Sequence, residues 1–258
     1  MLTVGSLFSG IGGLDLGLER AGMKVIWNCE IDPYACRVLK KHWPEIPNLG
    51  NIKEINWNDV PRPDVLCGGY PCQPLSYSGS RKGEEDPRHL FPWVAEAIRQ
   101  LRPRYAVMEN VSGHLSLGFG TVQGLLAEIG YDCRWDCVPA AAVGAPHLRD
   151  RVFIVATRND AVDSDCESES DFTKFVETTT SVPNSTRQRG KSGSESEIWF
   201  AEKWPAPRRC SEWETEPDVG RVAHGIPQRM DRLRGLGNAV VPQVAEVIGR
   251  LVVAHAGT

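Results

Sequence analysis

The alternation of short apolar runs with helical segments over residues 1–157 constrains the fold of this chain more than any other feature. The apolar runs, which are typical of buried strands, are Leu2–Phe8, Lys24–Cys29, Val65–Cys67, Tyr105–Met108 and Val152–Ala156. Segments with apolar residues at helical spacing separate them at 14–21, 33–42, 90–101 and 122–129. This order predicts an α/β fold in which helices cover both faces of a mostly parallel sheet. In such sheets, ligands bind beyond the carboxyl ends of the strands.

The second part of the chain has a different composition. Of the forty residues 159–198, thirteen are Ser or Thr and nine are acidic. Such a stretch buries little apolar surface, which predicts a loop-like segment. Trp199, Trp204 and Trp213 follow, and they form either a minimal core for a small lobe or base-stacking surfaces. Residues 239–254 regain helical spacing, and we expect this helix to return to the first domain, so that the lobe is an insertion.

The eight cysteines give no sign of a metal site or of a disulfide framework. They contain no Cys-x-x-Cys pair and no matching His pair, so we expect free thiols in a reducing cytosol. The apolar runs are too short to cross a bilayer, and the first residues lack the basic start of a signal peptide. A formal net charge of −4 means that any positive charge for nucleic acid must be local. We therefore expect no metal and no membrane contact.

Cys72 lies where an α/β fold can expose a thiol. The segment Asp64–Pro74 reads as a short apolar strand that runs into a turn rich in Gly and Pro. A cysteine at the exit of a central strand can be exposed and electrostatically tuned, as a reactive thiolate requires. A small apolar residue in a turn is the other interpretation, and this segment alone does not decide between them.

A glycine-rich turn lies between the first strand and the first helix. Its residues, Ser6–Leu14, let the backbone approach a ligand closely and leave helix N–H groups facing it. Glu30 follows the glycines by about twenty residues, which is where a carboxylate usually holds a ribose diol. The alternative is a solvated charge at a strand end. The spacing suits a dinucleotide and S-adenosylmethionine equally.

Three charged residues mark the ends of later strands. Glu109 follows four mostly apolar residues, where a carboxylate is costly unless it has a partner or a chemical role. In strand geometry Arg149 and Arg151 point to one face, where they form a fork for carbonyl or phosphate oxygens. The alternatives are a turn or helix-capping role for Glu109 and structural salt bridges for the two arginines, with Glu109 as one partner.

Five motifs occur in the order found in DNA (cytosine-5)-methyltransferases, and the chain resembles that family over residues 1–157 and 225–258. The motifs are Phe8-x-Gly10-x-Gly12, Pro71-Cys72-Gln73, Glu109-Asn110-Val111, Leu148-Arg149-Asp150-Arg151 and Gly237-Asn238. The resemblance implies a Rossmann-like sheet of the S-adenosylmethionine-dependent methyltransferases with a small inserted target-recognition lobe. It divides the chain into a catalytic and cofactor-binding domain (1–157), a target-recognition insertion (158–224) and a segment that returns to the catalytic domain (225–258).

The same resemblance implies the activity of a DNA (cytosine-5)-methyltransferase acting on a cytosine flipped out of duplex DNA. The thiolate of Cys72 adds to C6 in a covalent intermediate, which raises the electron density at C5. Glu109 holds or protonates N3, while Arg151 and Arg149 stabilise O2. C5 takes the methyl group from S-adenosylmethionine, and loss of the C5 proton and of Cys72 releases 5-methylcytosine.

Further residues take their roles from the family. The implied cofactor residues are Phe8, Gly10, Gly12, Glu30, Asn51, Ile52, Leu90 and Asn238. The implied DNA-facing residues are Gln73, Ser76, Ser78, Arg81, Arg229, Arg232 and Arg234, and for the three last a solvated surface is the alternative. Two positions depart from the family pattern, since His147 replaces a Gln and Asn51 replaces an Asp near the adenine. Neither departure removes a catalytic atom.

The resemblance also implies partners. We expect a monomer that acts on duplex DNA in the cytoplasm of a bacterial cell, nucleoid-associated or phage-encoded, with any cognate restriction endonuclease acting separately. Three other functions stay open: a degenerate relative that binds DNA or a partner without catalysis, an RNA cytosine methyltransferase of the same fold, and a dehydrogenase. Intact Cys72, Glu109 and Arg151 argue against degeneracy, and the inserted lobe favours duplex DNA. A dehydrogenase leaves Cys72 and the arginine pair unexplained.

Overall fold

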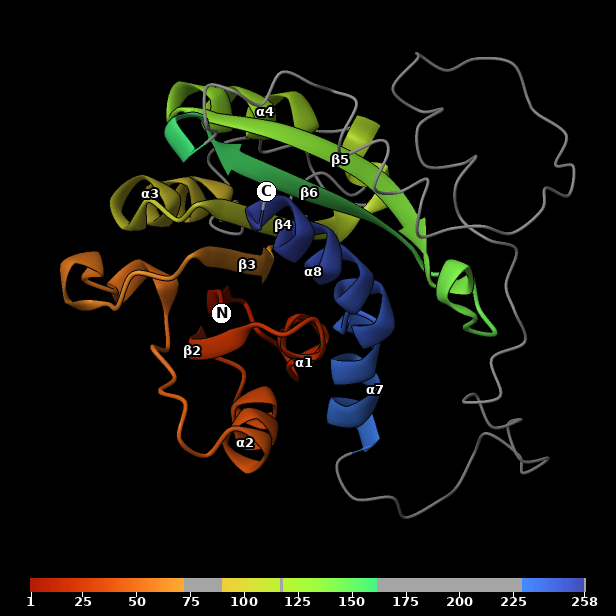
Figure 1. The fold of residues 1–258 in the computed structure, drawn as a ribbon. Helices are drawn as coiled ribbons and strands as arrows, with labels where there is room; N and C mark the ends of the chain where they lie inside the picture. Colours follow the sequence, from red (N-terminus) through yellow and green to blue (C-terminus); the bar gives the residue numbers. More distant parts are fainter. Residues whose placement is uncertain (72–89, 117, 162–228, 258) are drawn as a thin grey trace, which may run out of the picture.

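The computed structural model describes residues 1–71, 90–116, 118–161 and 229–257 (Figure 1). Within them, six strands form one mixed sheet with the order β2-β1-β3-β4-β6-β5. The strands are β1 (Thr3–Leu7), β2 (Lys24–Cys29), β3 (Val65–Gly69), β4 (Tyr105–Val111), β5 (Tyr131–Pro139) and β6 (Asp150–Arg158). The first four strands pair in parallel, and β6 is antiparallel to both β4 and β5. The predicted α/β fold is confirmed.

Helices connect the strands. They are α1 (Gly13–Arg20), α2 (Pro33–His42), α3 (Phe91–Leu101), α4 (Phe119–Glu128), α7 (Arg229–Asn238) and α8 (Pro242–Ala256). Short 3-10 turns are η1 (Ile52–Glu54), η2 (Trp57–Asp59), η4 (Ser112–Ser116), η5 (Ala140–Val143) and η6 (Asn159–Ala161). α2 begins where Asp32 Oδ1 accepts hydrogen bonds from the N–H groups of Tyr34 and Ala35, both at 2.9 Å, with Pro33 in the first turn.

Successive side chains of the central strands pack into two separate cores. In β3, Val65 and Cys67 pack on one side of the sheet and Leu66 on the other. Leu residues of α1 and Val residues of α8 cover the first side, whereas α3 and α4 cover the second. Both faces are therefore buried, which explains why these strands read as continuous apolar runs in the sequence.

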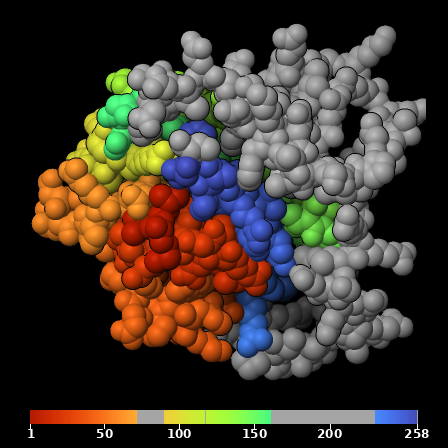
Figure 2. All heavy atoms as spheres, in the orientation of Figure 1, coloured from red at the N-terminus to blue at the C-terminus, as the bar shows by residue number. Residues whose placement is uncertain are grey.

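α8 packs against α1, although the two helices lie near opposite ends of the chain (Figures 1 and 2). Two glycines allow the close approach. A Cβ atom on Gly17 would lie 2.3 Å from the Cβ of Ala245, and one on Gly249 would lie 2.7 Å from the Cβ of Ala21. The C-terminal helix thus returns to the first part of the chain. The predicted domain boundaries at 157 and 224 stay predictions, because the residues between them are mostly outside the described part.

Residues Met230–Ala256 are long and apolar enough to cross a membrane by length and composition, with a mean hydropathy of 1.3 in the most apolar window. The sequence predicted no such run. The run is interrupted between α7 and α8, and α8 buries Val244, Ile248 and Val252 in the core that it shares with α1. These contacts are those of a core helix of a folded domain.

The sequence did not predict β5. Charged side chains at Asp132, Arg134 and Asp136 interrupt its apolar pattern, and its alternate residues Cys133 and Trp135 are only half-buried. The strand lies at the edge of the sheet, beside β6. An edge strand of an antiparallel pair has one face and one edge open to water, so it needs no continuous apolar run.

Candidate functional site

A cleft of about 1020 Å³ opens at the carboxyl ends of the four parallel strands. Its walls are the turn after β1, the end of β2, η1, the chain after β3 and β4, and the segment that joins α7 to α8. This is the edge of the sheet at which the sequence predicted a ligand. The predicted cofactor residues that line it are Phe8, Gly10, Glu30, Asn51, Ile52, Leu90 and Asn238.

The glycine-rich turn is held in a conformation that few side chains tolerate. Phe8, Gly10 and Gly12 have positive φ angles of 51°, 56° and 84°. Glycine adopts this region without strain, whereas Phe8 does so at a cost of about 1–3 kcal/mol, which the surrounding structure must offset. Gly12 is not among the residues that line the cleft, although Ile11 and Gly13 are, and a Cβ on Gly12 would be 2.4 Å from the ring of Trp43. Glycine is therefore needed here for close packing, and the cofactor contact of Gly12 stays a prediction.

Glu30 fixes this turn and keeps an acceptor for a ligand. Its Oε2 accepts a hydrogen bond from Gly10 N at 2.7 Å, and its Oε1 accepts from the N–H groups of Ile31 and Asp32, both at 2.8 Å. A carboxylate has about four acceptor positions, so one remains on Oε2. Asn48 braces the backbone of Glu30 on both sides, at 3.0 Å each. A half-buried carboxylate held in this way suits the ribose diol of an adenosine-containing cofactor.

Apolar side chains flank the position next to Glu30. Ile52 is buried with 4% exposed, and Ile31 is 68% exposed at the rim of the cleft. The sequence reasoning did not identify Ile31, although an exposed apolar residue directly after the acidic one is a usable signal. Asn51 Oδ1 accepts from Lys53 N at 3.2 Å, and its amide donates to Glu54 at 2.8 Å. Asn51 therefore caps η1, and its oxygen keeps one acceptor position.

Glu109 lies at the end of β4, where it is 7% exposed. Its Oε1 is 3.0 Å from Nε of Arg151. Burial raises the pKa of Glu109 from 4.5 to about 7, although Arg151 and Arg149 act in the opposite direction. Such a carboxyl is partly protonated near neutral pH, so it can act as an acid or as a hydrogen-bond donor.

Gly69 makes room for this carboxyl. Gly69 and Glu109 are partners in the parallel ladder between β3 and β4, and a Cβ on Gly69 would lie 2.7 Å from Glu109 Oε2. Any larger residue would therefore displace the acid. This is a requirement for glycine that the sequence reasoning did not assign to this position.

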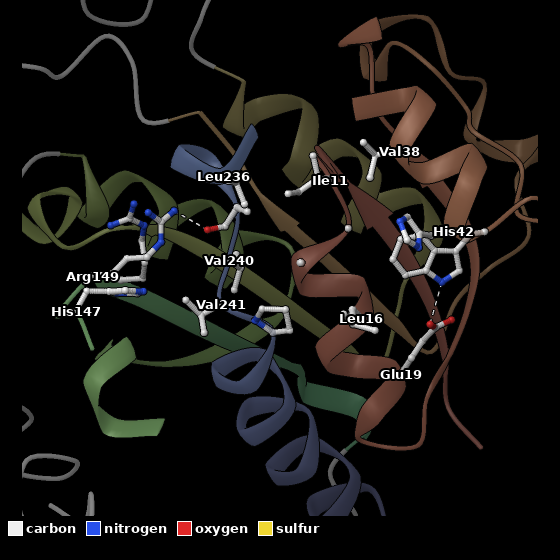
Figure 3. A pocket seen from close by; sticks show the side chains of 16 residues that line it. Ile11, Leu16, Glu19, Val38, His42, His147, Arg149, Leu236, Val240 and Val241 are labelled. Carbon is white, nitrogen blue, oxygen red and sulfur yellow. Dashed lines mark hydrogen bonds between the residues drawn. The ribbon is translucent and has the colours of Figure 1, made fainter. Parts of the chain in front are cut away.

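The strand alternation from which the fork of Arg149 and Arg151 was predicted is wrong. Arg149 precedes β6 and has a φ of 38°, so it does not share the alternation of the strand. Its Nη2 donates to the carbonyl oxygen of Gly237 at 2.7 Å. It also donates to that of Ala239 at 2.5 Å, the bond drawn from Arg149 in Figure 3. Of the two arginines, Arg151 forms the ion pair with Glu109, which agrees with the alternative interpretation of a structural salt bridge. Arg149 therefore holds the turn between α7 and α8.

A second, mostly apolar cavity of about 980 Å³ adjoins the first, and both are lined by Arg151 and Val240. Figure 3 shows Arg149 and His147 on one side of it and His42 on the other, with Leu236, Ile11 and Leu16 between them. Both arginines line this cavity, and Arg151 also lines the first cleft, where it pairs with Glu109.

The chain leading to Cys72 enters the cleft. Tyr70 and Pro71 line it, and Asn110 Nδ2 donates to Tyr70 O at 3.2 Å. Asn110 is 3% exposed, and it also accepts from Val111 N at 2.8 Å. Asn110 belongs to a motif in the sequence, but the motif does not predict these contacts. The predicted residues Cys72, Gln73, Ser76, Ser78 and Arg81 lie outside the described residues.

α7 carries the predicted basic cluster. Arg232 and Arg234 are exposed, and Arg234 lines the cleft with its Nη1 3.8 Å from Asp32 Oδ2. Arg229 begins the helix, and its side chain is not described. Asn238 borders the cleft, and Arg149 holds the residues on either side of it, Gly237 and Ala239. In the described part of the chain, no group of three or more His, Cys, Asp or Glu could hold a metal ion.

The family described as C-5 cytosine-specific DNA methylase has a sequence model that matches residues 2–216 of this chain. The chain belongs to this C-5 cytosine-specific DNA methylase family. The match includes the glycine-rich turn, Glu30, Cys72, Glu109 and both arginines, so the resemblance drawn from the five motifs is confirmed.

The chain is similar to methyltransferases from bacteria and from a Bacillus phage. It is 38% identical over 183 residues to the type II methyltransferase M.Eco47II of Escherichia coli, which covers 67% of this chain and 44% of that protein. It is similar to a solved DNA modification methyltransferase from an E. coli prophage, at 28% identity and a TM-score of 0.54, covering 62% of this chain and 47% of that one. The chain spans about half the length, or less, of the curated relatives that it matches.

One solved structure matches this methylase over nearly its whole length. The methyltransferase EhMeth of Entamoeba histolytica covers 99% of this chain and 99% of its own, with a TM-score of 0.60. The identity is 18%, so the likeness concerns the fold alone.

Proposed function

We propose that the protein transfers a methyl group from S-adenosylmethionine to C5 of a cytosine in duplex DNA. One observation carries the proposal: the buried Glu109–Arg151 pair lies in the same cleft as the turn anchored by Glu30. An acid with a raised pKa beside an adenosine-type cofactor site is the arrangement that methylation of a ring carbon needs. The family and its type II relatives support the same reaction.

The cleft fits S-adenosylmethionine by the chemistry of its lining. Glu30 keeps a free acceptor position for a ribose hydroxyl, and Ile31 and Ile52 offer apolar surfaces for an adenine ring. Gly10 lets the backbone come close to the ligand. When bound, the cofactor supplies an electrophilic methyl group.

The residues of the chain then activate the base. The Cys72 thiolate forms a bond to C6, and the electron pair displaced from the C5–C6 bond makes C5 nucleophilic. Glu109 donates a proton or hydrogen bond to N3, and Arg151 orients Glu109 and stabilises O2. After C5 is methylated, a base such as water removes the C5 proton, and the electrons expel Cys72 as thiolate. In this assignment Arg149 is a positioning residue rather than a catalytic one.

The remaining expectations belong to this proposal. Residues 158–224 recognise the target sequence, and Gln73, Ser76, Ser78 and Arg81 contact the DNA that carries the flipped base. Arg229, Arg232 and Arg234 contact phosphates. The protein acts as a monomer in the bacterial cytoplasm, and a cognate endonuclease acts as a separate protein.

Expression in E. coli that lacks cytosine methylation, followed by bisulfite sequencing, tests the proposal. We expect 5-methylcytosine at one recurrent sequence with the wild type and none with Cys72→Ser. Cys133→Ser, on the edge strand β5, is the matched control and should methylate normally. Unmethylated DNA from the wild type, or methylation by Cys72→Ser, would contradict the mechanism.

A further inference from the structure

A buried hydrogen bond joins the two segments that carry the nucleophile and the acid. The hydroxyl of Tyr70 lies 2.8 Å from Nε2 of His114, and the two rings meet edge to face at 5.6 Å and 76°. Tyr70 follows β3 and precedes Pro71 and Cys72 in the sequence. His114 lies in η4, directly after β4, the strand that carries Glu109 and Asn110 and ends at Val111.

The two rings of this pair are buried and pack on aromatic side chains. Tyr70 is 4% exposed and His114 is 5% exposed. The Tyr70 ring packs on Phe91 at 4.9 Å, and the His114 ring packs on Phe119 at 6.1 Å. Two apolar side chains would fill this space without any polar atom to satisfy. Breaking the hydrogen bond of a buried polar pair leaves a polar atom without a partner and away from water, which costs free energy. The pair therefore favours the one arrangement of the two segments that keeps the bond.

The location explains why such a contact is needed. The ladder between β3 and β4 ends at the pair Gly69 and Glu109. Beyond it the two chains leave the sheet, and backbone pairing no longer fixes their separation. Among the described residues, the side-chain contacts that cross this gap include Asn110 Nδ2 to Tyr70 O at 3.2 Å and the Tyr70 hydroxyl to His114.

We propose that Tyr70 and His114 are positioning residues, whose hydrogen bond sets the separation between the chain that leads to Cys72 and the acid Glu109. The inference rests on the proposed function for its effect on rate, but the contact itself can be tested without activity. Neither residue is assigned a contact with the reacting atoms. A separation error of about 1 Å between reacting groups is enough to slow a reaction markedly.

The chain offers a matched control at the other end of β4. The hydroxyl of Tyr105 lies 2.8 Å from Nδ1 of His255, and these rings meet at 5.7 Å and 85°. Tyr105→Phe therefore removes the same type of bond as Tyr70→Phe, far from the cleft. His114→Leu removes the partner of Tyr70, whereas His114→Gln keeps a polar group near the position of Nε2.

The experiment compares these variants by two measurements. Amide hydrogen exchange, followed by mass spectrometry, reports whether the contact holds residues 68–71 and 110–116. Single-turnover methylation of plasmid DNA from methylation-deficient cells, with tritiated S-adenosylmethionine, separates the rate constant from the KM for DNA.

We expect Tyr70→Phe and His114→Leu each to speed exchange in both segments and to lower the methylation rate constant roughly three- to tenfold, with KM unchanged. The double variant should be no slower than either single one, and His114→Gln should recover part of the rate. Tyr105→Phe should leave both readouts at the site unchanged. Unaltered exchange in Tyr70→Phe, or equal rate losses in Tyr70→Phe and Tyr105→Phe, would overturn the proposal. A wild type that transfers no methyl group refutes the proposed function, and exchange alone then decides whether the contact exists.

Discussion

Glu109 shows how a single residue acquires its chemistry from its surroundings. Burial raises its pKa to about 7, and the pairing with Arg151 keeps it in place. Because the protonated form acts on N3, the methylation rate constant should fall as pH rises through about 7. Glu109→Gln has nearly the same size but does not titrate, so it should be slower by roughly 100-fold or more and lose this step.

Single-turnover rates measured from about pH 6 to about pH 9 check this prediction. Glu96→Gln, on the exposed side of α3, is the control and should keep the wild-type profile. A pH step that persists in Glu109→Gln would assign the titration to another group.

Asp15 is a second residue whose environment decides its protonation. It is 1% exposed in α1, and its Oδ2 has no hydrogen-bond partner among the described residues. Burial raises the pKa of Asp15 from 3.8 to about 7. Folding therefore favours the protonated form of Asp15. Protonated Asp15 makes its full contribution to the free energy of unfolding below pH 3.8, and that contribution is lost as pH rises through about 7.

Asp15→Asn should therefore match the wild type in stability near pH 4 and exceed it by about 1–3 kcal/mol near pH 8. Urea unfolding at several pH values measures the difference. Asp132→Asn, exposed on β5, should show no comparable trend. A constant difference between Asp15→Asn and the wild type at all pH values would refute the raised pKa.

At the scale of elements, Arg149 couples the start of β6 to the turn between α7 and α8. Two carbonyl oxygens of this turn accept from its guanidinium, and Asn238, Ala239 and Val240 of the same turn line the cleft. Arg149→Met keeps the aliphatic stem but leaves both carbonyl groups without this donor. We expect a loss of about 1–3 kcal/mol in unfolding free energy and weaker S-adenosylmethionine binding.

Calorimetric titration with S-adenosylmethionine and urea unfolding check the two parts of this prediction. The control is Arg232→Met, which changes an exposed arginine of α7. Unchanged cofactor affinity in Arg149→Met would show that the turn keeps its shape without Arg149.

At the scale of the whole molecule, the fold depends on the contact between its first and last helices. Gly17 of α1 leaves no room for a side chain against Ala245 and the backbone of Pro242 in α8. Gly17→Ala should destabilise the protein by about 1–3 kcal/mol, since the helices must move apart. Gly124→Ala, in α4 with nothing within 4 Å of its Cβ position, should be neutral or stabilising by up to about 1 kcal/mol. Thermal unfolding compares the two, and equal effects would contradict the packing argument.

Much of the fold could be predicted because both faces of the central strands are buried. Continuous apolar runs such as Lys24–Cys29 identify such strands, and capping residues such as Asp32 and Pro33 mark the start of α2. β5 escaped prediction because an edge strand keeps charged residues such as Asp132 and Arg134. The antiparallel order of β6 also has no local signal, since it depends on which strand pairs with which.

The sequence by itself determined which residue types carry the chemistry: the spacing of the glycines to Glu30, and the acid at the end of an apolar strand. It also identified the family, because five short motifs in one order rarely agree by chance. Only the tertiary structure decided that Arg151 pairs with Glu109 while Arg149 holds the turn before α8. The same holds for the bond between Tyr70 and His114. Local spacing specifies which face of an element a side chain occupies, whereas a partner from a distant segment depends on how the whole chain packs.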